Sequence, residues 1–337
     1  MASSNKYAAV HIAPKGPGDA RPTALQILQD EGVEGKLNDK VILVTGASAG
    51  IGVETVRVLA RTGATIFAAA RDLKKAEKAL AGIEGKIELL ELDLASLASV
   101  RAAAADFLKR SGGKLNILVN NAGVMAIPNR TLTVDGFETQ FATNHLGHFL
   151  LFQLLKPALL ASTTPSFNSR VVVLSSAAHK AGGIRPKDYN FEEPGSYFDW
   201  VAYGQAKTAN LYMSNAIERY YGSKGLHSNA IHPGVIMTEL IRHLDKAFLE
   251  NFAQNPESQK GTKSIEQGAA TTVLAAIGKA YEGVGGKYLE DAGEWGPAAP
   301  DAGADLEARG HAPHAFDEAL EDQLWKDSNK FVGIKEE

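Results

Sequence analysis

The sequence predicts an α/β protein built on a doubly wound parallel sheet of about seven strands, with helices on both faces of the sheet. Between residues 40 and 290, short runs of consecutive apolar residues alternate with longer stretches of helical period. Continuous apolar runs are typical of strands that are buried on both faces. A glycine-rich turn follows the first of these runs, at the point where a strand would become a helix.

The apolar runs predict the strands in order, and most are followed by a helical stretch. Strands are expected at residues 41–44, 65–68, 87–92, 117–119, 171–174, 229–231 and 287–289. Helices are expected at residues 51–62, 74–80, 96–108, 137–160 and 203–221. The alternation gives a three-layer arrangement, because each crossover between parallel strands places its helix on one face of the sheet.

The chain divides into a central domain and two extensions. Residues 1–39 form an N-terminal extension in which scattered prolines and glycines interrupt regular structure, followed by a short helix over residues 23–30. Residues 40–290 form the central domain. Residues 291–337 form a C-terminal extension that is expected to pack on the same domain and to end in a helix over residues 316–330.

The composition argues against certain classes of partner. A formal net charge of −4 gives no indication of a nucleic acid or an anionic membrane surface as a partner. The absence of cysteine excludes disulfides and thiolate metal sites. The longest apolar stretch, residues 149–161, contains Gln153 and Lys156 and is too short to span a bilayer. We therefore expect a cytoplasmic protein without a membrane span.

The turn over residues 45–52, Thr-Gly-Ala-Ser-Ala-Gly-Ile-Gly, is the expected nucleotide site. Glycine allows positive φ there and lets the backbone approach a pyrophosphate, and the following helix offers free N–H groups to phosphates. The spacing Gly-x3-Gly-x-Gly differs from the G-x-G-x-x-G fingerprint. A mononucleotide-type fold, such as that of methyltransferases, and a tight structural turn therefore remain alternatives. The cofactor-binding candidates in this turn are Thr45, Gly46, Ser48, Gly50, Ile51 and Gly52.

The end of the second strand distinguishes the two nicotinamide cofactors. An NAD-dependent enzyme places a carboxylate there to bind the ribose 2′-hydroxyl. Counting 24 residues from Gly46 leads instead to the neutral Ala70, followed by Arg71, whose guanidinium can pair with a 2′-phosphate. We therefore predict NADP(H) in preference to NAD(H), although Asp72 follows directly and keeps the NAD alternative open.

Together with further motifs, these features resemble the short-chain dehydrogenase/reductase family, which has a Rossmann fold. The resemblance extends over residues 40 to 289. Its motifs are residues 45–52, Asp93-Leu94, Asn120-Asn121-Ala122-Gly123, Asn144, Ser176, Tyr203 with Lys207, and Pro233-Gly234 with Thr238. Residues 141–149 are similar to the branch that contains retinol dehydrogenases and the WW-domain oxidoreductase, and to many fungal secondary-metabolism reductases.

The resemblance implies a catalytic tetrad of Asn144, Ser176, Tyr203 and Lys207. Tyr203 is the expected general acid, because its phenol can give a proton to the alkoxide that hydride transfer to a carbonyl creates. Lys207, four residues later on the same helix, is expected to lower the pKa of Tyr203 and to bind the nicotinamide ribose. Ser176, rather than Ser175, is expected to donate a hydrogen bond to the carbonyl oxygen. Asn144 is expected to distort its helix and to support a proton relay through a water molecule.

The resemblance also implies cofactor contacts outside the glycine turn. Asp93 is expected to hold the adenine amino group, and Asn120 to link the sheet to Thr45 as well as to line the cofactor. Tyr203 and Lys207 are expected to contact the cofactor too. In full, the cofactor-binding positions that it implies outside the turn and α-helical pair are Asp93, Leu94, Asn120, Ala122, Gly123, Pro233, Gly234, Val235 and Thr238.

Two segments near the tetrad, residues 177–202 and 236–262, indicate the class of substrate. Residues 177–202 are rich in aromatic side chains, which suits an apolar or ring-containing carbonyl substrate but equally suits packing within the loop. Residues 236–262 look like the substrate lid that family members carry after the Pro-Gly turn. We expect an enzyme that reduces a ketone or aldehyde and reversibly oxidises the alcohol. An NAD-dependent alcohol dehydrogenase and a non-catalytic dinucleotide-binding regulator remain the alternatives.

Two expectations concern metals and assembly. His145 and His148 lie three residues apart, but no third ligand is evident, so no metal site is expected. Members of the family usually pair through the helices that carry Asn144 and Tyr203. The extensions at both ends of this chain could block that pairing, so a homodimer and a monomer both remain open.

Overall fold

An eight-stranded sheet carries the fold. The computed structural model describes residues 6–303 and 305–335, within which the strand order is β3-β2-β1-β4-β5-β6-β7-β8. All neighbouring strands pair in parallel except β7 and β8, which are antiparallel. The strands are β1 (Val41–Thr45), β2 (Thr65–Ala70), β3 (Lys86–Glu91), β4 (Ile117–Asn120), β5 (Ser169–Leu174), β6 (Leu226–Ile231), β7 (Tyr288–Glu290) and β8 (Gly293–Glu294). The predicted doubly wound sheet is confirmed, with one edge strand that was too short to recognise.

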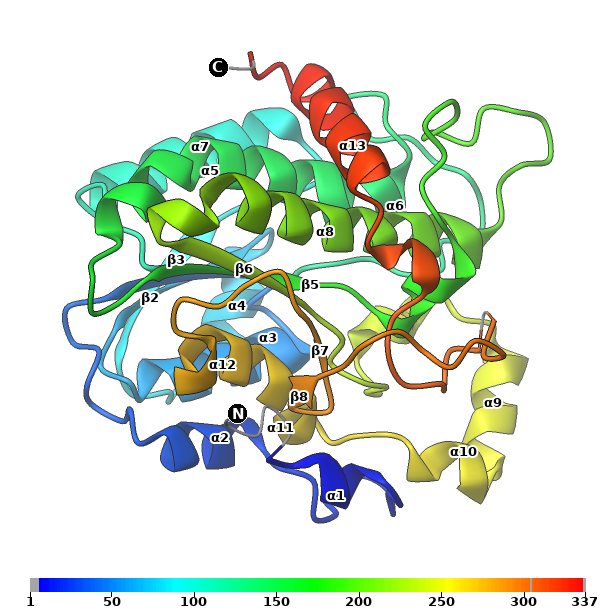
Figure 1. Cartoon of the computed structure of the whole chain (residues 1–337), viewed down its shortest axis with the longest axis horizontal. Coiled ribbons are helices and arrows are strands. Elements are labelled where there is room, and N and C mark those ends of the chain that lie inside the picture. The colour runs from blue at the N-terminus through cyan, green and yellow to red at the C-terminus, as the bar shows by residue number, and fades with distance from the viewer. Residues whose placement is uncertain (1–5, 304, 336–337) are drawn as a thin grey trace.

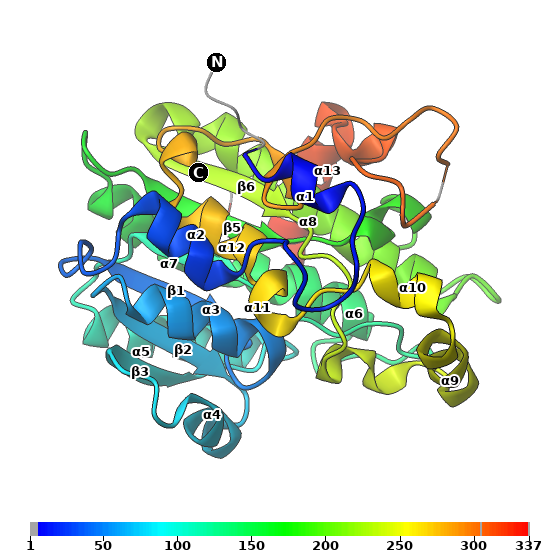
Figure 2. The same ribbon diagram turned by 90° about the horizontal axis from the view of Figure 1, so that it is seen from below.

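Helices cover both faces of this sheet. Figure 1 shows α5, α7 and α8 on one face and α3 and α12 on the other, and Figure 2 shows α2 beside α12 on that second face. The α-helices are α1 (Ala8–His11), α2 (Ala24–Glu31), α3 (Gly50–Ala60), α4 (Leu73–Leu80), α5 (Leu97–Arg110), α6 (Thr139–Phe141), α7 (Gly147–Ser162), α8 (Asp199–Tyr221), α9 (Lys246–Gln254), α10 (Pro256–Lys260), α11 (Ile265–Gly268), α12 (Ala270–Ile277) and α13 (Glu318–Phe331). Short 3₁₀ helices are η2 (Ala177–Ala181), η3 (Gly222–Lys224), η4 (Glu239–His243), η5 (Lys279–Tyr281) and η6 (Pro313–Ala315). Within the described residues, no helix is both long and apolar enough to cross a membrane.

Alternate strand residues enter two separate cores. In β1, Val41 and Leu43 belong to the core under α5, α7 and α8, whereas Ile42 and Val44 belong to the core under α3 and α12. Successive side chains of a strand point to opposite faces of the sheet, so a strand covered on both faces must be apolar throughout. This requirement explains the continuous apolar runs in the sequence.

The longest predicted helix is interrupted. The sequence predicts one helix over residues 137–160, but the structure has α6, then a π-helix, η1 (Ala142–Leu146), and then α7. A π-helix is a wider turn that often marks a functional site. It contains Asn144, so the helix is distorted at the residue where the family resemblance implied a distortion.

The N-terminal extension is attached to the α12 side of the sheet. Thr23 caps α2 by accepting a hydrogen bond from a first-turn N–H group, and Ile27 and Leu28 of this helix are fully buried. The buried guanidinium of Arg21 donates to the carbonyl oxygens of residues 261 and 262, at the end of the predicted lid. The extension therefore fixes the base of that lid.

The C-terminal extension packs on the opposite face. Helix α13 lies across α7 and α8, and the ring of Trp325 meets Phe149 of α7 at 4.9 Å and Tyr220 of α8 at 5.1 Å between centroids. Leu324 of α13 is also buried. The helix therefore covers part of the outer surface of α7 and α8.

Replacement of Trp325 by alanine tests whether the C-terminal extension contributes to the folded domain. The side chain is 8% exposed and its contacts would be lost, so we expect a destabilisation of about 3–5 kcal/mol in urea unfolding, within a single transition. Phe316→Ala is the control, because that side chain is 42% exposed and should cost much less. Equal losses from the two variants would show that α13 is not packed as described.

Candidate active site

A cavity of about 1760 Å³ lies at the carboxyl edge of the sheet, where the strand order reverses between β1 and β4. Every predicted site residue lines it except Asn120 and Asn144, which are both fully buried. The predicted residues that line the cavity are Thr45, Gly46, Ser48, Gly50, Ile51, Gly52, Arg71, Asp93, Leu94, Ala122, Gly123, Ser176, Tyr203, Lys207, Pro233, Gly234, Val235 and Thr238.

The turn between β1 and α3 has room for a phosphate and none for side chains. Gly46 and Gly50 have φ of +74° and +58°, and a Cβ atom on Gly52 would lie 2.2 Å from the carbonyl oxygen of Gly46. Helix α3 begins without a side-chain cap, so its first N–H groups are left for a ligand. Beside the turn, the buried side-chain oxygen of Asn121 has no partner among the described residues. These groups fit the pyrophosphate and ribose of a dinucleotide.

Thr45 joins the carboxyl ends of β1 and β4. Its Oγ1 accepts hydrogen bonds from the N–H groups of Asn121 at 2.9 Å and Ala122 at 3.0 Å. The Asn121 side chain donates in turn to the Thr45 carbonyl oxygen at 2.7 Å. The expected link through Asn120 is therefore wrong. Asn120 is still a residue of β4, so its side chain lies on a face of the sheet, fully buried and outside the cavity, and the next residue makes the link.

Arg71 lines the cavity at the carboxyl end of β2, directly after that strand. Its exposed guanidinium has no hydrogen bond or ion pair within the described part of the chain. The carboxylate of Asp72 caps α4 by accepting the N–H of Lys75 at 3.0 Å. The Lys75 ammonium forms an ion pair with Glu239 of η4. One free guanidinium therefore faces this end of the cavity, while the neighbouring carboxylate is engaged by a helix.

The two adjacent serines after β5 have different surroundings. Ser175 is buried, and its hydroxyl donates to the Lys207 carbonyl oxygen at 2.8 Å. Ser176 is partly exposed to the cavity, and its Oγ accepts the N–H of Ala178 at 3.2 Å. The Ser176 hydroxyl is the acceptor in that bond, so its own proton can be donated, either to the neighbouring Tyr203 oxygen or to a ligand.

Tyr203 and Lys207 are both buried on α8. The Lys207 ammonium lies 5.5 Å from the centre of the Tyr203 ring and donates to the Leu174 carbonyl oxygen at 3.0 Å. Burial lowers the pKa of Lys207 to about 8 and raises the pKa of Tyr203 to about 12, with a smaller opposite effect from the Ser176 hydroxyl. In the chain alone, burial is thus the main influence on the pKa of Tyr203, and the lowering by Lys207 stays a prediction.

Asn144 lies behind the cavity rather than in its wall. Its side-chain oxygen accepts the N–H of Val124 at 2.8 Å, and its amide nitrogen donates to the Val124 carbonyl oxygen at 2.9 Å. A Cβ atom on Gly123 would lie 3.0 Å from the Asn144 side-chain oxygen and 3.6 Å from the Lys207 nitrogen. A side chain at this position would therefore crowd the Asn144 amide.

The wall around Tyr203 is apolar. Tyr203 belongs to a small buried cluster with Met125, and Trp200 and three residues of the predicted lid pack against that cluster. Those lid residues are Leu240, Ile241 and Leu244. Of the aromatic residues predicted between 177 and 202, Trp200 alone lines the cavity. Tyr189 and Phe191 are buried within the loop, so packing explains most of that aromatic density.

Sequence reasoning missed the wall beyond the Pro-Gly turn. Asp291 accepts two ion pairs there, from Lys263 at 2.9 Å and from Arg309 at 3.1 Å. Trp295 and Leu306 of the C-terminal extension line the same part of the cavity. No motif marks these residues, but Asp291 directly follows the last parallel strand. Ligands of such sheets bind at the carboxyl ends of strands, so that position was a usable signal.

The histidine pair considered for a metal site is engaged in the core. His145 Nε2 lies 2.9 Å from Ser328 Oγ, and His148 Nε2 lies 2.8 Å from Thr45 Oγ1. Burial lowers the pKa of His145 to about 3 and that of His148 to about 4, so both rings are neutral. Across the described ranges, no group of three or more histidine, aspartate and glutamate side chains could hold a metal ion.

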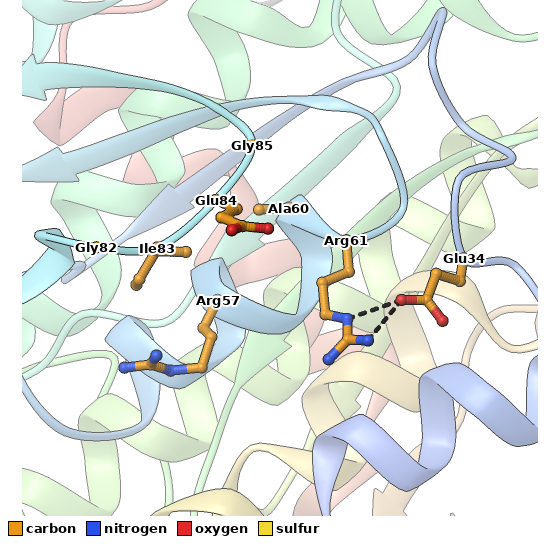
Figure 3. Close-up of a pocket in the computed structure, with 8 residues that line it drawn as sticks. All are labelled: Glu34, Arg57, Ala60, Arg61, Gly82, Ile83, Glu84 and Gly85. Carbon is orange, nitrogen blue, oxygen red and sulfur yellow. Dashed lines mark hydrogen bonds and ion pairs between the residues drawn. The ribbon is translucent and has the colours of Figure 1, made fainter.

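A second hollow, of about 530 Å³, lies at the amino edge of the sheet, between the end of α3 and the start of β3 (Figure 3). Two arginines line it. Arg61 is paired with Glu34 at 2.6 Å, and Arg57 with Glu54 at 3.1 Å. Both cations already have carboxylate partners, and the hollow contains no predicted site residue.

Comparison with known proteins identifies the family. A family model described as short chain dehydrogenase matches residues 40–190. The short-chain dehydrogenase/reductase prx1 of Penicillium roqueforti is 51% identical over 333 residues, which cover 98% of this chain and 96% of that protein. Human retinol dehydrogenase 13 is 38% identical over 303 residues, which cover 88% of this chain and 85% of that protein. The chain belongs to the short-chain dehydrogenase/reductase family, and its relatives include both fungal members and retinol dehydrogenases, as predicted.

Solved structures agree with this assignment. An uncharacterised protein from Mycobacterium paratuberculosis is 33% identical, with a TM-score of 0.66, and the match covers 88% of this chain and 94% of that chain. The RhlG protein of Pseudomonas aeruginosa, solved as a complex with NADP, is 26% identical, with a TM-score of 0.58 and coverages of 76% and 96%. The fold is thus the Rossmann-like fold of a family of oxidoreductases that bind nicotinamide dinucleotides.

The Thr45 junction gives a test of the site's framework. Thr45→Val keeps the side-chain shape but leaves the N–H groups of Asn121 and Ala122 without their acceptor, so we expect a loss of about 1–3 kcal/mol in urea unfolding and weaker dinucleotide binding. Thr55→Val is the matched control, because that hydroxyl only donates to the carbonyl oxygen of Ile51 within α3. If both variants were equally stable, the junction would not be the framework described here.

Proposed function

We propose that this chain is an NADP(H)-dependent reductase of ketones or aldehydes that also catalyses the reverse oxidation of the alcohol. One observation carries the proposal. A single cavity is lined by the free guanidinium of Arg71 after β2, by the glycine turn after β1, and by Ser176 after β5 with Tyr203 and Lys207, and the strand order places these groups in that sequence along the sheet edge. This order matches the order of 2′-phosphate, pyrophosphate and nicotinamide along NADPH.

The preference for NADP(H) depends on charge at the adenosine end. A 2′-phosphate carries negative charge and pairs well with a planar guanidinium, whereas a carboxylate would repel it. Arg71 has no partner within the described residues, while the carboxylate of Asp72 is used by the α4 cap. The solved NADP complex of RhlG supports the same cofactor.

Ser176 and Tyr203 provide the hydrogen bond and the proton that carbonyl reduction needs. Bound NADPH supplies the hydride. Ser176 donates its O–H proton in a hydrogen bond to the substrate carbonyl oxygen and so stabilises the negative charge that develops there. Tyr203 gives its proton to the same oxygen. Because burial holds the pKa of Tyr203 near 12, the phenol is fully protonated at neutral pH and ready to act as the acid.

Lys207 stabilises the phenolate that is left after proton transfer. Its hydrogen bond to the Leu174 carbonyl oxygen holds the ammonium beside Tyr203. With a pKa of about 8, Lys207 is mostly charged at pH 7 and loses this charge as the pH rises above 8. Asn144 supports the return of a proton from solvent through a water molecule.

The substrate is a bulky apolar or ring-containing carbonyl compound. Ligand pockets commonly measure about 300–1,000 Å³, so a cavity of about 1760 Å³ has room for a large substrate beside the cofactor. The side chains of Met125, Trp200 and Leu240 give the region around Tyr203 an apolar wall. The name of the human relative, a retinol dehydrogenase, agrees with a substrate of this class.

Tyr203→Phe should lower kcat by ~10²–10⁴ and leave the dissociation constant for NADPH unchanged, because only the transferable proton is removed. The measurement is NADPH oxidation with a panel of aromatic and aliphatic ketones and aldehydes. Tyr281→Phe is the matched control, since its buried hydroxyl has no partner in the described residues. Near-normal turnover by Tyr203→Phe would refute the assignment of the acid.

Arg71→Ala should weaken NADPH binding by ~10- to 100-fold and leave NADH binding unchanged, because a charge-assisted hydrogen bond to phosphate is lost. Calorimetric titration with each cofactor measures both constants. Lys74→Ala, which removes a neighbouring exposed cation outside the cavity wall, controls for the general effect of charge. A similar change for both cofactors would remove Arg71 as the reader of the 2′-phosphate.

A further inference from the structure

The C-terminal extension holds the turn that carries Ser176. Ser176 immediately precedes η2, and residues 308–315 lie against this short helix although they are 128 to 135 residues away in sequence. The Lys180 ammonium donates to the Ala308 carbonyl oxygen. Two further hydrogen bonds join the same segment to His179, so His179 is the main point of contact.

The ring nitrogens of His179 have distinct partners. Nε2 lies 3.0 Å from the backbone nitrogen of Ala312, which can only donate, so Nε2 is the acceptor and carries no proton. A neutral imidazole then carries its proton on Nδ1. Nδ1 lies 2.6 Å from the carbonyl oxygen of Ser176 and donates to it. The ring is fully buried, and burial lowers the pKa of His179 to about 3, so it stays neutral at physiological pH.

The backbone of His179 is held as firmly as its ring. Its carbonyl oxygen accepts a hydrogen bond from His314 Nε2 at 2.9 Å. The single proton of the Thr208 hydroxyl points between this oxygen, at 3.2 Å, and the closer Gly182 carbonyl oxygen, at 2.6 Å. Thr208 follows Lys207 on α8. His179 is therefore connected to the serine turn and to the C-terminal extension, and its carbonyl group lies beside Thr208 of α8.

We propose that His179 is a positioning residue for Ser176, and that residues 308–315 act on the reaction by keeping the proton of His179 on Nδ1. The proposal rests on the proposed function of Ser176. The bond from Nδ1 holds the Ser176 carbonyl group and with it the turn in which the Ala178 N–H orients the Ser176 hydroxyl. With the proton on Nε2 instead, a nitrogen lone pair would face an oxygen at 2.6 Å, and only the backbone N–H of His179, at 3.1 Å, would still hold the Ser176 carbonyl group.

A second role for His179, filling space in the core, must be separated from this one. Its ring lies 5.3 Å from that of Tyr288, so its loss would also leave a cavity. A space-filling residue would act on stability and would be indifferent to which nitrogen carries the proton. Only the positioning role requires the proton on Nδ1, and only that role makes the effect of a His179 substitution depend on the Ser176 hydroxyl.

The tautomer can be observed without any substrate. Nitrogen NMR of the full chain labelled with ¹⁵N-histidine distinguishes a protonated Nδ1 from a protonated Nε2, and the signal that disappears in His179→Asn belongs to His179. We expect the form protonated on Nδ1. A signal from the form protonated on Nε2 would overturn the proposal, whatever the enzyme's activity.

Two variants separate the bonds of His179. An asparagine side chain ends near the position of Nδ1 and can still donate to the Ser176 carbonyl oxygen, whereas a glutamine ends near Nε2 and can only replace the contact with Ala312. We expect His179→Asn to keep kcat within about threefold and His179→Gln to lower it by ~10- to 100-fold, with unchanged NADPH affinity. Equal losses of kcat would mean that His179 only packs.

A double-mutant cycle with Ser176→Ala tests the coupling. If His179 acts through Ser176, His179→Gln should change kcat by less than about twofold once the serine hydroxyl is gone. If His179→Gln lowered kcat by the same factor with and without the serine hydroxyl, the two effects would be independent and the proposal would be contradicted. The single variant Ser176→Ala tests the proposed function separately. If that variant kept full activity, the proposed role of Ser176 would be wrong, whatever the result for His179. Leu324→Ala is the control, since this buried side chain belongs to α13 and lies outside residues 308–315, and its effect should multiply with that of Ser176→Ala.

Discussion

The hydroxyl of Thr45 is the interaction on which the rest of the site depends. It holds the ends of β1 and β4 at the position where the strand order reverses, and it brings the Asn121-Ala122 backbone against the glycine turn. A Cβ atom on Gly46 would lie 2.8 Å from the Cα atom of Ala122, so the two segments are already in contact. The shape of the dinucleotide site is thus set by one buried hydroxyl and by the absence of side chains around it.

The same hydroxyl is connected to the proposed catalytic residues. Thr45 Oγ1 is 2.8 Å from one ring nitrogen of His148, and the other ring nitrogen is 2.9 Å from the Asn144 carbonyl oxygen. Asn144 in turn holds the Val124 backbone next to Gly123 and Lys207. A chain of buried hydrogen bonds therefore runs from the cofactor turn to the tetrad. Burial also sets the pKa values in the site. It raises the pKa of Tyr203, so the phenol stays protonated, and it lowers the pKa of Lys207 to about 8, close to neutral pH.

Local sequence patterns predicted the sheet, the glycine turn and the positions of Ser176, Tyr203 and Lys207, because each follows from its neighbours in the chain. Strand β8 has only two residues and carries no periodic signal. Asn120 and Asn121 are adjacent amides, and only the point at which β4 ends decides which one reaches Thr45. The pKa of Tyr203 depends on burial by segments distant in sequence. The contacts of His179, Asp291 and Arg309 join parts of the chain that no local pattern relates.

The most direct test of the central claim is calorimetric titration of the unmodified protein with NADPH and with NADH, which requires no knowledge of the substrate. The account predicts that NADPH binds much more tightly, since Arg71 offers a free guanidinium at the adenosine end of the cavity. Tighter binding of NADH would contradict the assignment of the cofactor. Binding of neither would contradict the interpretation of the cavity as a dinucleotide site.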